Sequence, residues 1–148
     1  MFSGEYNHTL DNKGRLTIPA KFRHDFDDGL IVTRGLDGCL FIFTVKAWAN
    51  YEANVLQQLA IEKKDSRSFL RYIYSGADKL RPDGQGRIIL PARLREYAGI
   101  ETEAVVIGIE ERLEVWSPER WQAVLAEVEH DAEQIAEGLV RMQKQAVP

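Results

Sequence analysis

Residues 10–23 read LDNKGRLTIPAKFR, and residues 81–95 read RPDGQGRIILPARLR. Asp, Gly, Arg, Pro, Ala and a final Arg recur in both stretches at a fixed offset of 72 residues. Further along the chain, Trp121 follows Trp48 by 73 residues. A pattern repeated at a fixed period indicates duplication. The sequence therefore predicts two copies of one module, each about half of the chain.

Each copy opens with an Asp followed three residues later by a Gly, which is typical of a type I turn. The Asp side chain can accept hydrogen bonds from backbone N–H groups of the turn, and the Gly can adopt the positive φ that comes after them. We therefore expect Asp11, Gly14, Asp83 and Gly86 to shape two matching turns.

An arginine follows the glycine in both copies, as Arg15 and Arg87. A turn of this kind does not require a cation there, but the turn carboxylate can hold a guanidinium in a bidentate pair and fix its rotamer. An arginine held in this way can bind phosphate, or the O6/N7 edge of guanine in the DNA major groove. The alternative is a surface ion pair that contributes little to stability.

The doubled pattern Asp-x-x-Gly-Arg-(apolar)-x-(apolar)-Pro-Ala-x-(apolar)-Arg resembles the MraZ family of bacterial transcriptional regulators, as do the first six residues, MFSGEY. Each half is similar to the swapped-hairpin domain of AbrB-type DNA-binding proteins and of some antitoxins. The resemblance implies an α+β fold in which two tandem repeats form a pseudo-dimer, an interleaved double-split β-barrel with peripheral helices and a long C-terminal helix. We expect the first repeat and its linking helices in residues 1–76, and the second repeat with the C-terminal helix in residues 77–148.

The same resemblance implies a sequence-specific regulator that binds short direct repeats in the promoter of its own division and cell-wall gene cluster. It also implies a ring-shaped homo-oligomer, with an octamer favoured. We expect no cofactor, metal or small-molecule substrate. By position, Arg15 and Arg87 would contact double-stranded DNA, oriented by Asp11, Gly14, Asp83 and Gly86. The further candidate phosphate contacts are the basic residues in and after the motifs: Lys13, Lys21, Arg23, Arg93 and Arg95. Gln85 replaces Lys13 in the second copy, so the two motifs should not bind equally.

The charge of the chain is unevenly distributed. The 148 residues carry a net charge of −4, which alone argues against a nucleic-acid partner. Residues 1–95, however, hold 15 Lys/Arg against 11 Asp/Glu, a net charge of +4, whereas residues 96–148 hold 4 against 12, a net charge of −8. If the basic residues of this first part lie on one face, that face can attract phosphate through counterion release. The effect becomes useful when several subunits present the basic face together.

No apolar run approaches the length of a bilayer, and the N-terminus lacks a signal-peptide pattern. We therefore expect a cytoplasmic, nucleoid-associated protein without a membrane partner. The single cysteine, Cys39, has no partner for an internal disulfide, and its position predicts a buried thiol on a strand.

Two hairpins are expected in each copy. In the first, a strand at 5–10 pairs with one at 15–18, and a strand at 30–35 pairs with one at 39–44 across Asp37-Gly38, a favoured hairpin turn. The second copy repeats this with strands at 77–81, 86–90, 105–109 and 113–116. Helices are expected to start near Pro19, Val45 (with Thr44 as N-cap), Ser66, Pro91 and Pro118.

We expect no catalytic and no metal-binding residues. His8, His24 and His130 stand in unlike contexts without a partner at metal-ligand spacing, and neither a Gly-rich phosphate loop nor a nucleophile elbow is present. Asp11 and Asp83 could be paired catalytic carboxylates only with raised pKa values. A turn Asp followed by Arg should instead have a lowered pKa, the wrong direction for a general acid.

The C-terminal helix offers an alternative function, that of an antitoxin-like protein-interaction module. Its apolar residues follow at steps of four and three, which is the pattern of one edge of a coiled coil. The helix can lie on its own subunit or contact a neighbour, and the pattern fits both. We call these residues the C-terminal seam: Trp121, Leu125, Val128, Ala132, Ile135, Leu139 and Met142.

Overall fold

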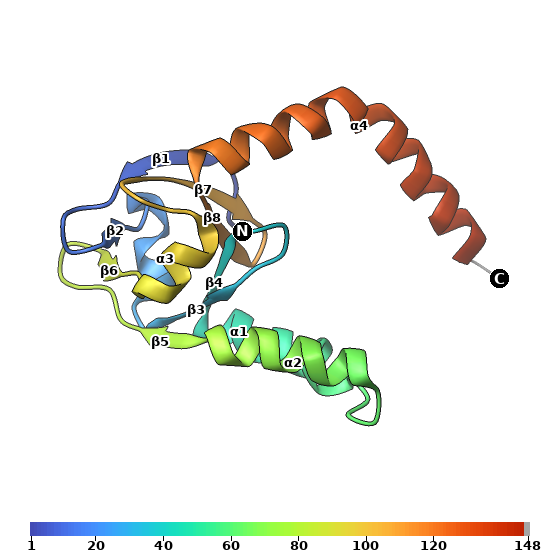
Figure 1. Ribbon diagram of the computed structural model, residues 1–148, viewed down its shortest axis with the longest axis horizontal. Coiled ribbons are helices and arrows are strands. Elements are labelled where there is room, and N and C mark those ends of the chain that lie inside the picture. The colour runs from blue at the N-terminus through green and yellow to red at the C-terminus, as the bar shows by residue number, and fades with distance from the viewer. Residues whose placement is uncertain (147–148) are drawn as a thin grey trace. The chain divides into compact units, whose positions relative to one another are not determined.

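The computed structural model describes residues 1–146 and confirms an α+β chain with a long C-terminal helix (Figure 1). The chain divides into two compact units, Met1–Pro118 and Glu119–Pro148. The strands are β1 (Glu5–Thr9), β2 (Arg15–Thr17), β3 (Leu30–Arg34), β4 (Leu40–Thr44), β5 (Asp78–Leu80), β6 (Arg87–Ile89), β7 (Glu103–Ile109) and β8 (Arg112–Trp116). The helices are η1 (Ala20–Phe26), α1 (Val45–Asn54), η2 (Leu56–Gln58), α2 (Lys64–Gly76), α3 (Ala92–Ala98) and α4 (Pro118–Ala146).

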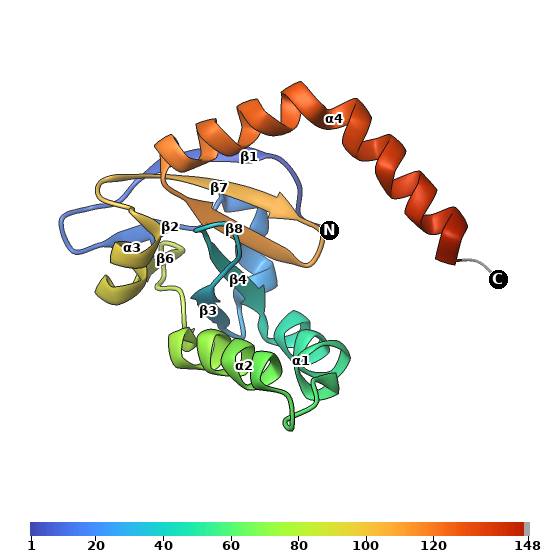
Figure 2. The ribbon, with the colours of Figure 1, turned by 45° about the vertical axis from the view of Figure 1, so that its right-hand side comes forward.

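The first unit contains a six-stranded antiparallel sheet in the order β1-β7-β8-β4-β3-β5. Each repeat contributes one hairpin, β3–β4 or β7–β8, and the two hairpins join at β4 and β8. The outer strands are exchanged between the repeats: β1 of the first pairs with β7 of the second, and β5 of the second pairs with β3 of the first. The strands of the two repeats are therefore interleaved in one sheet (Figure 2).

A second sheet consists of β2 and β6 alone, and we call it the β2–β6 ribbon. The two strands run antiparallel, with Arg15 opposite Ile89, Leu16 opposite Ile88 and Thr17 opposite Arg87. The expected local hairpins, β1 with β2 and β5 with β6, are therefore wrong. The motif turns do reverse the chain, but each motif strand takes its partner from the other repeat.

The register reveals a two-fold relation between the repeats. Leu16 and Ile88 occupy equivalent places in the two motifs, and they face each other at the centre of the ribbon. In the main sheet, Phe41 pairs with Glu114, which stands 73 residues later. Equivalent residues thus meet in both sheets, which is the pairing that an antiparallel two-fold arrangement requires.

The central hairpins close through tight turns. In the first, Asp37 and Gly38 both have positive φ, 66° and 86°, as a type I′ turn requires, and this confirms the predicted turn. In the second, Glu110 takes a φ of 57°, and Ile109 pairs with Arg112 across the two-residue loop. The backbone of Phe2 exchanges hydrogen bonds with Glu110 at 2.8 and 2.9 Å, which places the start of the chain beside this turn.

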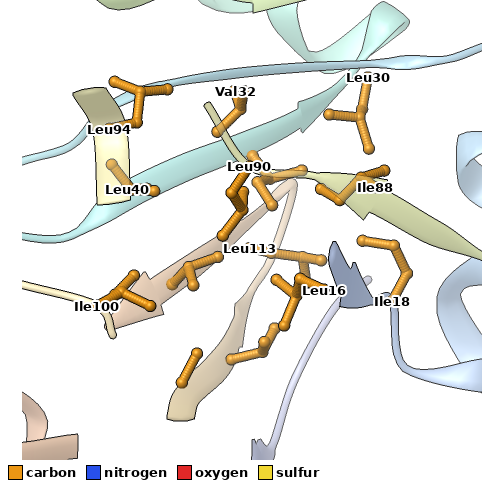
Figure 3. Close-up of a cluster of buried hydrophobic side chains, with 14 of the residues drawn as sticks. Leu16, Ile18, Leu30, Val32, Leu40, Ile88, Leu90, Leu94, Ile100 and Leu113 are labelled. Atoms are coloured by element: carbon orange, nitrogen blue, oxygen red, sulfur yellow. The ribbon is translucent and has the colours of Figure 1, made fainter. Parts of the chain in front are cut away.

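One hydrophobic core serves both repeats (Figure 3). Leu16 and Ile18 of the first motif pack in the same cluster as Ile88 and Leu90 of the second, and all four are almost completely buried. Each fully buried Leu or Ile stabilises the fold by about 1.5–3 kcal/mol. Since the cluster draws on both copies, neither repeat has a separate core. Cys39 is also buried, as expected.

The two connecting helices pack against the central hairpin of the first repeat. The N-cap of α1 is Thr44, whose hydroxyl accepts a hydrogen bond from the backbone N–H of Ala47 at 3.0 Å, as predicted. The hydroxyl of Thr33 on β3 donates to the carbonyl of Ile73 on α2 at 2.6 Å. The hydroxyl of Tyr72 donates to the carbonyl of Gly35 at 2.6 Å. These bonds hold α2 on β3.

Helix α4 begins at Pro118, as predicted, and carries Glu119 in its first turn and Lys144 in its last, which suits the helix dipole. Along the described length of α4, no residue is buried. The exposed large apolar residues of the C-terminal seam are Val128, Ile135, Leu139 and Met142. No helix within residues 1–146 combines the length and the apolar character needed to cross a membrane.

Candidate nucleic-acid interface

The first motif folds as the sequence predicts. Oδ1 of Asp11 accepts hydrogen bonds from the backbone N–H groups of Lys13 and Arg15, both at 2.9 Å. The N–H of Gly14 donates to the carbonyl of Asp11 at 3.0 Å, and Gly14 has a φ of 75°. Since this φ lies in the left-handed region, glycine is the residue that fits here.

The second motif repeats this geometry closely. Oδ1 of Asp83 accepts from the N–H groups of Gln85 and Arg87, both at 2.9 Å. The N–H of Gly86 donates to the Asp83 carbonyl at 2.9 Å, and the φ of Gly86 is 76°. The replacement of Lys13 by Gln85 therefore leaves the shape of the turn unchanged.

Each motif arginine is held by the carboxylate of its own turn. Nε of Arg15 donates to Oδ2 of Asp11 at 2.6 Å, and Nε of Arg87 donates to Oδ2 of Asp83 at 2.9 Å. The carboxylate thus binds one N–H of the guanidinium and two backbone N–H groups, which differs from the expected bidentate pair. Within residues 1–146, the terminal Nη groups of both arginines make no hydrogen bond. They are free to bind a partner in a fixed direction.

The pKa values of the two carboxyls confirm the expected direction. The pKa of Asp11 is lowered to about 2, first by the backbone N–H of Arg15 and then by the Arg15 side chain and the backbone N–H of Lys13. The pKa of Asp83 is also lowered, first by the backbone N–H of Arg87. Both carboxylates therefore remain ionised at neutral pH, where each can hold its guanidinium.

The β2–β6 ribbon brings the two arginines to one face. Successive residues of a strand point to opposite sides, and Leu16 and Ile88 point into the core, with 0% and 2% exposure. Arg15, Thr17, Arg87 and Ile89 therefore share the other side, which we call the outer face of the ribbon. The side chains of Arg15 and Arg87 are 26% and 29% exposed there.

The ribbon is closed at both ends by bonds that cross between the repeats. The N–H of Ile18 donates to the carbonyl of Gly86 at 2.8 Å, and the N–H of Leu90 donates to the carbonyl of Gly14 at 3.1 Å. Each strand of the ribbon is thus tied to the motif turn of the other repeat. The separation and direction of the two arginines are fixed by this backbone ladder.

The side chains of Arg23 and Arg95 each bond within their own repeat and then reach the motif turn of the other repeat. Nε of Arg23 points to the Ile18 carbonyl at 3.4 Å, and Nε of Arg95 donates to the Leu90 carbonyl at 3.0 Å. The side chain of Arg23 passes over Gly86, so close that an added Cβ would meet its Nε at 2.5 Å. The side chain of Arg95 passes over Gly14 in the same way. Each motif turn therefore carries two arginines, one from each repeat.

The remaining candidates lie farther from the ribbon. Lys13 is exposed in the first turn, and Gln85 is exposed at the same place in the second. The Nζ of Lys21 lies 5.3 Å from the ring centroid of Tyr6, within cation–π range. Arg93 is exposed near the start of α3. These side chains are accessible, and the arginines whose side chains contact the two turns are Arg15, Arg23, Arg87 and Arg95.

Comparison with known proteins finds the same duplication. A family model described as "MraZ protein, putative antitoxin-like" matches residues 1–72 and again residues 73–143. The chain is 47% identical over 140 residues to the transcriptional regulator MraZ of Ligilactobacillus salivarius, covering 95% of this chain and 97% of the relative. It is 46% identical to the MraZ regulator of Desulforamulus reducens and 45% identical to that of Moorella thermoacetica, covering 95% of this chain in both cases and 98% and 97% of the relatives.

The chain belongs to the MraZ family. It therefore contains two MraZ domains and belongs to a family of transcriptional regulators, which are not enzymes. Within residues 1–146, no three His, Cys, Asp or Glu side chains lie together in a way that could hold a metal ion.

Two residues on the outer face of the β2–β6 ribbon, Thr17 and Ile89, are absent from the residues expected at the site. The signal was present in the sequence, because both stand two positions after a motif arginine and two positions on a strand return to the same face. Strand alternation alone would have found them.

Arg81 and His24 were also missed. They line a hollow of about 300 Å³ beside the turn of the second motif, together with Arg23, Asp27 and Asp83. The equivalent of Arg81 in the first repeat is Thr9, and the equivalent of His24 in the second repeat is Glu96, so the basic character around the second turn has no counterpart around the first. Arg81 comes near Arg23 and His24 only through the exchange of elements between the repeats.

Proposed function

We propose that the chain is a sequence-specific DNA-binding regulator of transcription, whose two Asp-x-x-Gly-Arg motifs contact the bases of short direct repeats. The single observation that carries this proposal is the β2–β6 ribbon, which places Arg15 and Arg87 on one outer face with their Nε groups held and their Nη groups free. The proposed targets lie in the promoter of the chain's own division and cell-wall gene cluster.

The dimensions of the ribbon suit the major groove of DNA. That groove is about 12 Å wide and admits a two-stranded β-ribbon, and arginine binding to guanine O6 and N7 is the commonest specific contact within it. Because Asp11 and Asp83 fix the rotamers, Arg15 and Arg87 lose little side-chain freedom on binding. The ordering cost is met during folding, which favours a contact that depends on the base sequence.

The other basic residues are proposed as phosphate contacts. Lys13, Arg23 and Arg95 belong to the two turns or lie against them, and Lys21 and Arg93 follow at equivalent places at the starts of η1 and α3. Contacts to phosphate fix the register of a protein on the duplex without reading its sequence. Lys13 has no basic equivalent in the second motif, and Arg81 has none in the first, so the two motifs should contribute unequally to salt-dependent affinity.

We further propose that the exchanged strands form the swapped-hairpin barrel of AbrB-like proteins, with the two repeats as a pseudo-dimer. The cross-repeat pairs β1–β7, β3–β5 and β2–β6 support this arrangement. The proposed first repeat spans residues 1–76 with its linking helices, and the second spans residues 77–148 with the C-terminal helix.

A ring of subunits, with an octamer favoured, is proposed for assembly at the nucleoid in the cytoplasm. One guanidinium contact to a base is worth about 1–3 kcal/mol of discrimination. Ring assembly raises the total, because after the first motif binds, the later contacts become intramolecular and have a high effective concentration. Weak single motifs can then produce tight binding to repeated boxes.

DNase I footprinting on the DNA upstream of the chain's own gene tests the proposal. Wild-type protein should protect short repeats at a regular spacing. Arg15→Ala and Arg87→Ala should each weaken the protection while the number of subunits in the assembly stays unchanged. Arg71→Ala is the matched control, because Arg71 is an exposed arginine on α2 rather than on the ribbon. Full protection by both motif variants would refute the assigned role of the arginines.

The second candidate function is an antitoxin-like protein-interaction module that uses α4. The observation in its favour is the C-terminal seam, whose members Val128, Ile135, Leu139 and Met142 are exposed. A salt titration separates the two functions. Binding through Arg and Lys should weaken steeply between 50 and 200 mM salt, roughly in the manner of other phosphate contacts, whereas apolar docking along the seam should change little.

A further inference from the structure

Ile89 is unusual among the apolar residues of the motifs. Its neighbours Ile88 and Leu90 are 2% and 0% exposed, but Ile89 is 57% exposed. It is not a loop residue, since it belongs to β6 and pairs with Arg15. The ribbon therefore holds a large branched apolar side chain toward solvent in a fixed position.

Ile89 is a neighbour of both arginines that the proposed function assigns to DNA. It stands directly opposite Arg15 and two residues after Arg87, on the same outer face. Side chains that face each other on an antiparallel pair have Cβ atoms about 4.5–5.5 Å apart. Anything that Arg15 binds from this face is thus within reach of Ile89.

The equivalent place in the first repeat is occupied by Thr17, which stands opposite Arg87. The ribbon therefore presents two cross-strand pairs, each with one arginine. Arg15 is paired with an isoleucine, and Arg87 is paired with a threonine. The backbone relation is symmetric, but the chemistry of the outer face is not. The two halves should prefer different base steps.

The charge of the surroundings identifies the partner of this apolar group. Two partly exposed arginines beside Ile89 favour a polyanion over a second copy of an apolar surface. In the DNA major groove, the apolar group that a base edge offers is the C5-methyl of thymine. Neighbouring bases of one strand are about 3.4 Å apart, and paired side chains on the ribbon have Cβ atoms about 4.5–5.5 Å apart, so a long arginine and its opposed isoleucine can reach adjacent bases.

We infer that Ile89 contacts the C5-methyl group of a thymine adjacent to the guanine bound by Arg15. This inference rests on the proposed function, because it needs the outer face of the ribbon in the major groove. It adds a preference that arginines alone cannot supply: Arg15 and Ile89 together recognise a guanine with a neighbouring thymine. Thr17 in the other half offers a hydroxyl and one methyl group, so its selection for thymine is weaker.

The test replaces the thymines of a protected box one at a time by deoxyuridine, which removes only the methyl group. At one position, wild-type affinity should fall about fourfold, the factor expected when one methyl group loses its burial. Ile89→Ala should bind thymine and deoxyuridine duplexes equally at that position, and Ile89→Thr should lie between. Ile61→Ala is the control, because Ile61 is 66% exposed and lies outside the ribbon.

Three results would overturn the inference. Wild-type protein could bind every deoxyuridine duplex as well as the parent thymine duplex. Ile89→Ala could keep the fourfold ratio between the two duplexes. Ile89→Ala could also change the number of subunits in the assembly, which would show that a second copy covers Ile89. The proposed function fails separately, if wild-type protein does not prefer the native box to a scrambled duplex. Circular dichroism of Ile89→Ala should match the wild type, since the side chain is outside the core.

Discussion

Gly86 offers a sharp test of the motif geometry, because the structure gives both the cost of changing it and a matched control. Gly86 has a φ of 76°, and an added Cβ would lie 2.5 Å from Nε and 2.7 Å from Cδ of Arg23. A non-glycine residue in the left-handed region costs about 1–2 kcal/mol. The clash itself is with a flexible side chain, so Arg23 moves away at little further cost in stability.

Gly86→Ala should therefore lower the free energy of unfolding by about 1–2 kcal/mol. With a urea m value of about 2 kcal/mol/M, the midpoint of unfolding should fall by roughly 0.5–1 M. The displaced Arg23 should also weaken DNA binding. Both effects are measured at one protein concentration, because assembly stabilises the folded state by mass action.

Gly84→Ala is the control for this change, two residues away in the same turn. An added Cβ at Gly84 meets nothing within 4 Å, and the φ of Gly84 is outside the left-handed region. Its midpoint should match the wild type or rise slightly, since alanine reduces the freedom of the unfolded chain. Equal midpoints for Gly86→Ala and Gly84→Ala would refute the argument from backbone strain.

Three further predictions concern the core, the turn carboxylate and α4. Leu16→Ala should lower the free energy of unfolding by about 2–5 kcal/mol, because the side chain is fully buried, whereas Ile89→Ala on the opposite face should stay within about 0.5 kcal/mol of the wild type in denaturant titrations. The pKa of Asp11 is lowered to about 2 in the folded chain, so the stability that its ionised form contributes is fully present above pH 4 and is lost as the pH falls toward 2. Unfolding of Asp11→Asn measured from pH 6 to pH 2 should show a weaker loss than the wild type, and identical slopes would contradict the assignment. Gly138→Ala should raise the helicity of α4 in circular dichroism and stabilise that helix by about 1 kcal/mol, since nothing lies within 4 Å of the added Cβ, and an unchanged or lower helicity would argue against this.

The local features of the motifs could be predicted from the sequence because each depends on residues close together. The spacing of Asp11 and Gly14 specifies the turn, Asp37-Gly38 specifies the central hairpin, and Thr44 caps α1, all as expected. A cap or a turn needs only a side chain and the next few backbone groups. The doubling of the motif also led directly to the family.

The partners of the strands could not be predicted in the same way. The alternation of buried Leu16 with the outward Thr17 fits a partner in β1 as well as one in β6, so the pattern leaves the pairing open. A local hairpin was the simplest assumption, but the shared core places Leu16 beside Ile88, and the exchange buries both motifs in one cluster.

The same limit applies to the candidate site. Arg23 and Arg95 end the two motifs in the sequence, but their side chains pass over the glycines of the opposite motifs. Arg81 joins Arg23 and His24 around one hollow only after the repeats have interleaved. These are tertiary relations, and sequence spacing within one repeat contains no information about them.

The most direct measurement is the ratio of affinities for the native repeats and for a scrambled duplex of equal length, at one salt concentration, for wild-type protein and for an Arg15→Ala/Arg87→Ala double variant. If the two guanidiniums on the ribbon read the bases, the wild type prefers the native repeats strongly and the ratio for the double variant falls close to one. A double variant that assembles with the wild-type number of subunits and keeps the wild-type ratio would contradict the role assigned to the two arginines.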